Sequence, residues 1–278
     1  MRIVKVNKDS IANILSDLLK RSPTNYGDFQ DKVDAIIKNV RDNGDKAVFD
    51  YTAQFDKAEI NADNILVTEE EIKEAYEEVD DELIKVIRKA IKNIRDFHEK
   101  QIQKSWFETR EDGVMLGQKV TPMETCGVYV PGGKAVYPSS VLMNIVPAHV
   151  AGVKNIIMTT PPGKDGKVTA NTLVAAKEAG ATKVYKVGGA QAIAAMAFGT
   201  ESIPKVDKIV GPGNIFVALA KKAVYGNVSI DSIAGPSEIL VLADETANPR
   251  YVAADLLSQA EHDEMASAIL VTTSEELA

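Results

Sequence analysis

Four short glycine-containing loops are the segments of this sequence best suited to holding a ligand. Each follows a strand-like run of apolar residues, and helices begin at Gln191 and Asn214 after two of them. Glycine lets backbone N–H groups approach a ligand closely, and the first turn of a helix offers unpaired donors to an anion such as a pyrophosphate. Tight turns, with Asn214 as a simple helix cap, explain the same pattern, so spacing alone leaves both interpretations open. The loops are residues 131–133, 188–189, 211–213 and 234–237.

A second candidate site lies in residues 258–264 (SQAEHDE), where Gln259 and His262 are three positions apart. On a helix this spacing places both side chains on one face, close enough for an amide oxygen and an imidazole nitrogen to share a metal ion. Glutamine is an uncommon zinc ligand, and two ligands do not complete a tetrahedral shell. The alternative is a polar helix end at which His262 complements the helix dipole.

Cys126 and Tyr129 lie in one strand-like segment, and each has a structural and a chemical interpretation. Burial as a small apolar residue is commoner for a cysteine such as Cys126 than a nucleophilic role. Tyr129 could place its ring against a flat ligand, and a core aromatic fits equally well. The sequence contains no GxGxxG with a downstream acidic partner, no phosphate-binding P-loop motif, no nucleophile elbow and no CxxC pair.

Composition argues against several classes of protein. The formal net charge of −8 makes nucleic acid an unexpected partner. A single cysteine excludes an intrachain disulfide and agrees with a reducing compartment, so we expect a cytoplasmic protein. No apolar run approaches the ~20 residues that cross a membrane, so we expect no membrane partner.

The elements that would position these residues change in character along the chain. Helical apolar stripes run from Asp9 to about Lys104 and include a longer helix over residues 80–103. Residues 106–121 predict a hairpin with its turn at Asp112 and Gly113. After Thr125 the order strand, loop, helix repeats, which predicts an α/β fold with a largely parallel sheet. The helical stripes comprise Ile11, Ile14, Leu15, Leu18 and Leu19; Phe29, Val33, Ile36, Ile37 and Val40; and Leu83, Val86, Ile87, Ala90, Ile91 and Ile94.

Four stretches taken together resemble the histidinol dehydrogenase family. They are CGVYVPGG, VGGAQAIAAMAFGTESIPKVDKIVGPGN, IAGPSE and DLLSQAEHD. Their order and separations match the family, and the resemblance runs from about Gln118 to the end of the sequence, with a looser helical match before it. The resemblance implies oxidation of L-histidinol to L-histidine through an aldehyde, with two NAD molecules used in succession, in the closing steps of histidine biosynthesis. It also implies a zinc ion and a homodimer.

The resemblance also assigns site residues. It implies that Tyr129, Gln191 and Asn214 contact NAD. Ser237, Gln259 and His262 would contact the substrate, and the last two would also bind zinc. No position matches the family's proton acceptors, which we expect beyond Ala278, so no catalytic residue is assigned and we expect no substantial turnover from these 278 residues alone.

We therefore expect an α/β protein with two Rossmann-like parallel-sheet domains and an N-terminal helical segment. The first domain would be discontinuous and incomplete, made of residues 1–112 and 233–278, and residues 113–232 would form the NAD-contacting domain. Two alternatives stay open at this point. One is a semialdehyde dehydrogenase in which Cys126 attacks an aldehyde, and the other is a non-catalytic nucleotide-binding fragment.

Overall fold

The computed structural model of the chain divides into two compact units. The larger unit is Gln30–Ile233, and the smaller unit combines Met1–Phe29 with Ala234–Ala278. The structure describes residues 3–7, 11–12, 16, 27–132, 138–233, 238–261 and 266–278. None of the helices in this part of the chain combines the length and apolarity that crossing a membrane requires.

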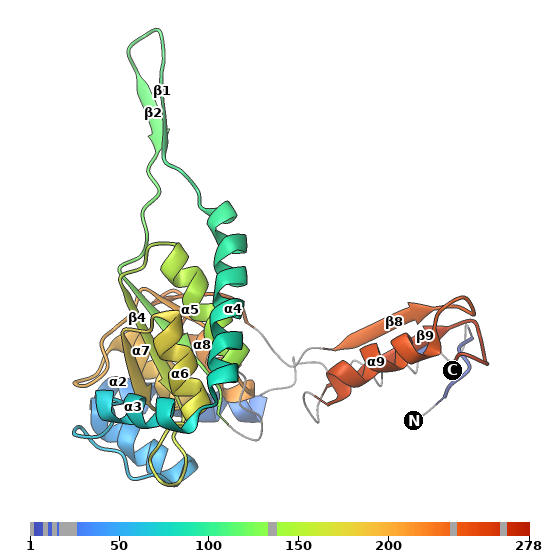
Figure 1. Cartoon of the computed structure of the whole chain (residues 1–278), viewed down its shortest axis with the longest axis horizontal. Helices are drawn as coiled ribbons and strands as arrows, with labels where there is room; N and C mark the ends of the chain where they lie inside the picture. The colour runs from blue at the N-terminus through green and yellow to red at the C-terminus, as the bar shows by residue number, and fades with distance from the viewer. Residues whose placement is uncertain are drawn as a thin grey trace. The chain divides into compact units, whose positions relative to one another are not determined.

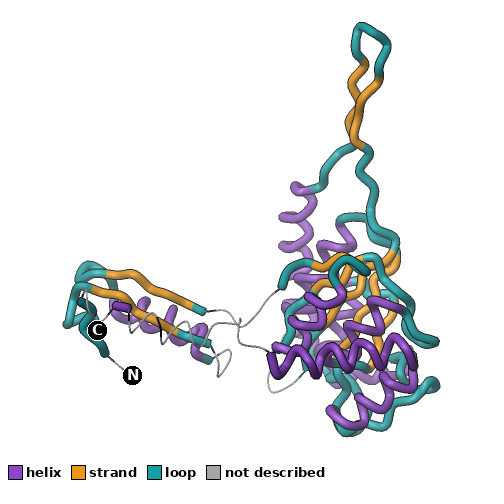
Figure 2. Tube along the Cα trace, turned by 180° about the vertical axis from the view of Figure 1, so that it is seen from behind, coloured by secondary structure: helices purple, strands orange, loops and turns teal. Residues whose placement is uncertain are grey.

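A five-stranded parallel sheet forms the centre of the larger unit, with helices on either side of it (Figure 2). The spatial order is β5-β4-β3-β6-β7. The chain moves outward from β3 through β4 to β5 and then returns to place β6 on the other side of β3, so a crevice is expected where β3 and β6 end. The strands are β3 Thr125–Tyr129, β4 Asn155–Thr160, β5 Lys183–Lys186, β6 Lys208–Val210 and β7 Ser229–Ile230.

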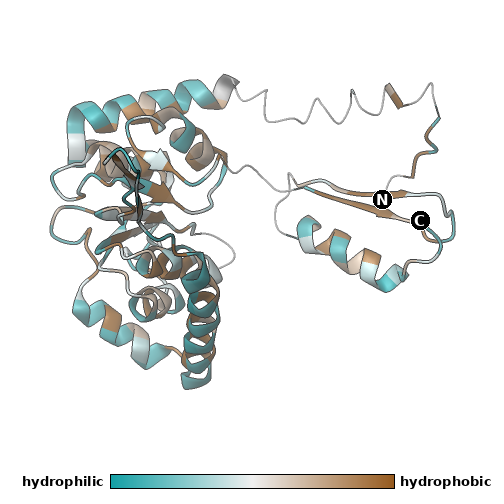
Figure 3. Cartoon of the chain, turned by 90° about the horizontal axis from the view of Figure 1, so that it is seen from above, coloured by the Kyte–Doolittle hydropathy of each residue, from teal (hydrophilic) through white to brown (hydrophobic). Residues whose placement is uncertain are grey.

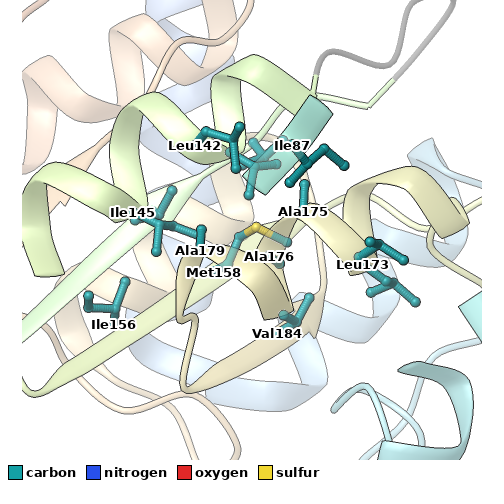
Figure 4. Close-up of a cluster of buried hydrophobic side chains, with 14 of the residues drawn as sticks. Ile87, Leu142, Ile145, Ile156, Met158, Leu173, Ala175, Ala176, Ala179 and Val184 are labelled. Carbon is teal, nitrogen blue, oxygen red and sulfur yellow. The ribbon is translucent and has the colours of Figure 1, made fainter. Parts of the chain in front are cut away.

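One face of this sheet carries a single apolar core shared with four helices (Figure 4). Residues alternate between the faces of a strand, so Val128 and Met158 enter this core while Gly127 and Thr159 face the other side. On that other side, Met196 of α7 lies against both Gly127 and Thr159. The core helices are α3 Glu69–Glu78, α4 Asp81–His98, α5 Pro138–Val150 and α6 Ala170–Ala179; α7 Gly189–Phe198 packs with α8 Ile215–Val224.

The N-terminal helical prediction is confirmed in α2 (Gly27–Phe55) and needs a correction in α4, whereas Ile14, Leu15, Leu18 and Leu19 of the first predicted stripe lie outside the described residues. In α2 the predicted stripe is buried apart from Phe29. In α4 the predicted Val86 is exposed, and Ile84, which was not predicted, is buried with Ile87 and Ile91. The buried positions are three and four apart, so Val86 lies about 100° from Ile87 on the helix surface. The helix ends at His98 and a 3₁₀ turn, η2 Glu99–Gln101, follows it.

The predicted hairpin is confirmed as β1 Trp106–Thr109 and β2 Met115–Gln118, which pair antiparallel. Its turn contains Gly113 at φ 82°, and the Asp112 carboxylate accepts a hydrogen bond from the Val114 N–H. The hairpin projects from the body of the larger unit (Figure 1), and every residue of its two strands is exposed.

The smaller unit contains a strand, a helix and a strand: β8 Ile239–Ala243, α9 Pro249–Ala260 and β9 Ala268–Thr272. The two strands are parallel, and Asn248 caps α9 directly before Pro249. The hydrophobic colour runs along both strands in Figure 3. The two units therefore share the predicted α/β class, each with parallel strands.

The predicted domain limits at residues 112 and 233 stay a prediction. In the described structure the helices α3 and α4 belong to the larger unit, because Ile84, Ile87 and Ile91 share a core with α5 and α6.

Candidate functional site

A cavity of about 1040 Å³ opens at the carboxyl ends of the central strands. It is lined by residues that end or follow four strands: Tyr129 ends β3, Thr160 ends β4, Gly189 follows β5 and Asn214 follows β6. This is the point at which the strand order reverses, where open α/β sheets bind ligands. We call this cavity the switch-point pocket.

Three helices begin at the switch-point pocket. The first turns of α6, at Ala170–Thr172, and of α7, at Gly189–Gln191, line it, and so does Asn214, the residue that caps α8. The first N–H groups of a helix lack partners within the helix and form the positive end of its dipole. The pocket is therefore suited to an anionic group such as a pyrophosphate.

Close packing explains the glycines in the described part of the predicted loops. A Cβ on Gly188 would lie 2.5 Å from Pro161 Cβ, and a Cβ on Gly132 would lie 2.5 Å from Pro161 Cγ. Gly211 has φ +118°, and a Cβ there would lie 2.0 Å from the Tyr129 carbonyl oxygen. These glycines are thus required by the fold itself, and they do not by themselves indicate a ligand.

Gln191 carries a clearer sign of a ligand. Its side chain is 1% exposed and borders the switch-point pocket, and its Oε1 has no hydrogen-bond partner among the described residues. The carboxamide folds back over Gly189, where a Cβ would lie only 2.6 Å from Oε1. A buried oxygen without a donor costs about 1–3 kcal/mol. A ligand that brings an N–H or O–H group would remove this cost.

Tyr129 and Asn214 border the same pocket, so the structure brings together the three predicted NAD-contacting residues. Tyr129 is buried, as a core aromatic would be, and its hydroxyl accepts a hydrogen bond from the Gly189 N–H at 3.1 Å. Burial raises the pKa of Tyr129 to about 12, so the hydroxyl stays protonated at neutral pH and can donate. Asn214 caps α8 through a 3.2 Å bond from the Val217 N–H to Oδ1, as the simpler interpretation predicted. Its Nδ2 amide is the group left to donate to a ligand.

Sequence reasoning missed Asp56, which also lines the switch-point pocket. This residue directly follows α2, and its Oδ2 is buried without a hydrogen-bond partner in the described part of the chain. Burial raises the pKa of this carboxyl group from 3.8 to about 6. No motif could have found it, because only the tertiary fold brings the end of α2 to the strand ends.

An ion pair made by the buried Lys221 fixes the loop before Asn214, and sequence reasoning missed this too. Lys221 of α8 is 2% exposed, pairs with Asp231 and donates to the Gly211 carbonyl at 2.9 Å. Asp231 in turn accepts from the Gly211 N–H at 2.8 Å. The backbone of Gly211 is therefore held on both sides.

The predicted metal site is only partly visible. Gln259 lies half-buried in the last turn of α9, whereas Ser237 and His262 lie outside the described residues. Within the described ranges, no group of three or more His, Cys, Asp or Glu side chains could hold a metal ion. One carboxamide oxygen does not make a zinc site, so the described residues do not fit zinc by themselves.

Cys126 lies away from the switch-point pocket and borders a second cavity of about 640 Å³, beside α5. Its side chain is buried, and desolvation raises the pKa of the thiol to about 11. A nucleophilic cysteine needs a lowered pKa and access. The alternative function that relies on attack by Cys126 is therefore not favoured.

Comparison with known proteins finds close relatives over nearly the whole chain. A histidinol dehydrogenase from Halalkalibacterium halodurans is 58% identical over 279 residues, which cover 100% of this chain and 64% of the relative. One from Bacillus subtilis is 60% identical over 276 residues, with 99% and 64% covered. The crystal structure of histidinol dehydrogenase from Elizabethkingia anophelis superposes with a TM-score of 0.86 at 42% identity and covers 99% of this chain and 62% of that one.

The chain thus spans about 64% of the length of the curated relatives it matches. The family profile described as histidinol dehydrogenase matches residues 19–278. By this match, and as the motifs predicted, the chain belongs to the histidinol dehydrogenase family.

Proposed function

We propose that the protein containing this chain is an NAD-dependent L-histidinol dehydrogenase that oxidises L-histidinol to L-histidine through the aldehyde. Family membership supports the reaction. The observation that carries the cofactor assignment is the unpartnered Oε1 of Gln191 in the switch-point pocket. When bound, NAD supplies the hydride acceptor for each oxidation.

The residues of this chain would hold NAD by complementary polar groups. The first turns of α6, α7 and α8 offer N–H donors to the pyrophosphate. Gln191 Oε1 accepts a hydrogen bond from the cofactor, and Asn214 Nδ2 and the Tyr129 hydroxyl donate to it. The cavity volume is at the upper end of the range for small-molecule sites, which suits a ligand as large as a dinucleotide.

Zinc and substrate binding rest on the resemblance to the family. Ser237, Gln259 and His262 would contact histidinol, and Gln259 and His262 would supply two of the zinc ligands. Metal analysis of the protein dialysed against zinc, before and after Gln259→Ala, tests this assignment; equal zinc content would contradict it. The homodimer and the cytoplasmic location also remain predictions. Because no residue of the chain matches the family's proton acceptors, we expect assays of these 278 residues alone to show no substantial histidinol oxidation.

Calorimetric titration of NAD into the purified chain tests the proposed pocket. We expect saturable binding that Gln191→Leu weakens at least about tenfold, because the ligand's donor loses its acceptor. Gln118→Leu is the matched control, since Gln118 lies on the exposed hairpin outside the pocket. Absence of NAD binding, or equal affinities of the two variants, would overturn the cofactor assignment.

A further inference from the structure

Three acidic residues line the switch-point pocket, and among the described residues Asp56 is the one of them with a buried, unpartnered oxygen, since Glu78 is exposed. Asp165 also lines the pocket, but it is exposed and its Oδ1 accepts a hydrogen bond from the Lys167 N–H at 3.1 Å. The Asp56 Oδ2, in contrast, is buried with no donor among the described residues. Of the two lysines that line the pocket, Lys164 is exposed and Lys167 is paired with Glu74 at 3.0 Å. A buried carboxylate without a donor is costly, so this position is suited to a ligand that supplies one.

The backbone holds Asp56 in place. Its N–H bonds to the Thr52 carbonyl and so ends α2, and the next residue, Lys57, adopts the left-handed conformation at φ 58°. Lys57 Nζ donates to the Gln54 carbonyl at 2.7 Å, and Ala58 is fully buried. Residues other than glycine seldom adopt this conformation, and it persists where the surrounding structure fixes it.

The chemistry of a carboxylate limits what it can bind. An ionised carboxylate only accepts hydrogen bonds, so its ligand group must carry O–H or N–H donors. Phosphate groups do not meet this requirement and belong at the helix N-termini of the same pocket. In a dinucleotide, a ribose diol lies next to the phosphates, and its two hydroxyls are donors that suit a carboxylate in the same pocket as the helix N-termini.

We propose that Asp56 accepts a hydrogen bond from the adenosine ribose of the bound dinucleotide, and that its negative charge excludes a ribose carrying a 2′-phosphate. The inference rests on the proposed function and deepens it, because it assigns the preference for NAD over NADP to one residue. The raised pKa of Asp56 agrees with this role, since a ligand donor would replace the hydration that burial has removed.

Affinities of the purified chain for NAD and NADP, measured by calorimetry, test the proposal. The unchanged chain should prefer NAD at least about tenfold. Asp56→Asn should weaken NAD binding about tenfold and leave NADP binding equal or tighter, so that the preference falls about tenfold or more. Asp63→Asn is the matched control, because it removes the same charge from an exposed residue outside the pocket, and it should leave the preference within about twofold.

A second measurement includes an arm that uses the unchanged chain alone and therefore does not depend on the folding of a variant. The unchanged chain should bind the 2′-deoxyadenosine form of NAD about tenfold more weakly than NAD, and Asp56→Asn should bind the two about equally. If NAD binds but the NAD-to-NADP preference is the same in Asp56→Asn and the unchanged chain, the Asp56 role is wrong and the pocket assignment survives. If the unchanged chain does not bind NAD, both the proposed role of Asp56 and the assignment of the pocket to NAD are wrong.

Discussion

Two cavities of the larger unit, the switch-point pocket and the cavity beside Cys126, differ in how their buried polar atoms are paired. In the switch-point pocket, Gln191 Oε1 and Asp56 Oδ2 have no partner in the described structure. In the second cavity, Lys208 Nζ donates to the Ile230 carbonyl at 2.8 Å, and Cys126 is buried with a raised pKa. Unpaired buried acceptors are uncommon in folded proteins because they cost stability. The difference indicates that the first cavity is arranged for a ligand, whereas the second contains groups that are already paired or unreactive.

The largest effect that would sharpen this comparison is expected from Gly211→Ala. Its φ of +118° is strained for alanine, and the new Cβ would overlap the Tyr129 carbonyl oxygen. We expect the free energy of unfolding to fall by more than about 3 kcal/mol in urea titrations followed by circular dichroism. Gly152→Ala is the control beside the second cavity: it has φ +85° but only ordinary contacts, and should cost about 1 kcal/mol. Equal losses would show that the strand ends at the pocket are not tightly packed.

Lys221→Met should have the next largest effect. It leaves the Gly211 carbonyl without its buried donor and Asp231 without its cation, so we expect a loss of about 2–4 kcal/mol in the same titrations. Lys222→Met is the control. Lys222 is the exposed neighbour of Lys221, so this substitution should change the free energy of unfolding by less than about 0.5 kcal/mol. A loss no larger than in the control would mean that this ion pair does not stabilise the pocket loop.

Asp56→Asn should stabilise the chain modestly, and only at neutral pH. The carboxyl pKa is raised in the folded state, from 3.8 to about 6, so ionisation opposes folding and stability falls as pH rises through this window. After discounting for partial exposure, we expect the variant to be more stable by about 1 kcal/mol at pH 7.5 and equal at pH 3.5. Thermal unfolding at both pH values measures this difference. Lower stability of the variant at pH 7.5 would show that Asp56 has a partner in the free protein.

The smallest effect on ligand binding is expected at the second cavity. Cys126→Ala should leave the NAD affinity within about twofold, since Cys126 does not line the switch-point pocket. With a thiol pKa of about 11, alkylation by iodoacetamide at pH 7.5 should be about a hundredfold slower than for an exposed cysteine, and faster as pH rises. Mass spectrometry of the alkylated chain measures the rate. Rapid alkylation that abolishes NAD binding would indicate that the cavity beside Cys126, and not the switch-point pocket, binds NAD.

Sequence reasoning was accurate where the signal is local. The strand, loop and helix order after Thr125 predicted every strand of the central sheet, because apolar runs separated by glycine loops are a local pattern. The turn of the hairpin followed from Asp112 and Gly113 in the same way. The helix start at Asn214 was placed correctly and the one predicted at Gln191 lies two residues earlier, at Gly189; the structure adds that both starts line one pocket.

Features that depend on long-range packing could not be predicted. Asp56 meets the pocket only because α2 ends there, and its sequence context is that of an ordinary exposed helix end. From its sequence context Lys221 would be expected to be solvated, yet it is buried and donates to the Gly211 carbonyl. Ile84 is buried and Val86 is exposed because of the way α4 packs against α5 and α6, which its own sequence does not determine. In each case a neighbour distant in sequence determines burial.

The central pairing of the sheet has a consequence for folding kinetics. Cys126 of β3 pairs with Lys208 of β6, 82 positions further along the chain. The pairing of β3 with β4 closes a much shorter loop. Closing the longer loop costs more chain entropy and slows assembly. The switch-point pocket therefore forms only when β6 has docked. A ligand of this pocket would bind only after β6 has docked, so the heat of ligand binding during refolding would report when that step occurs.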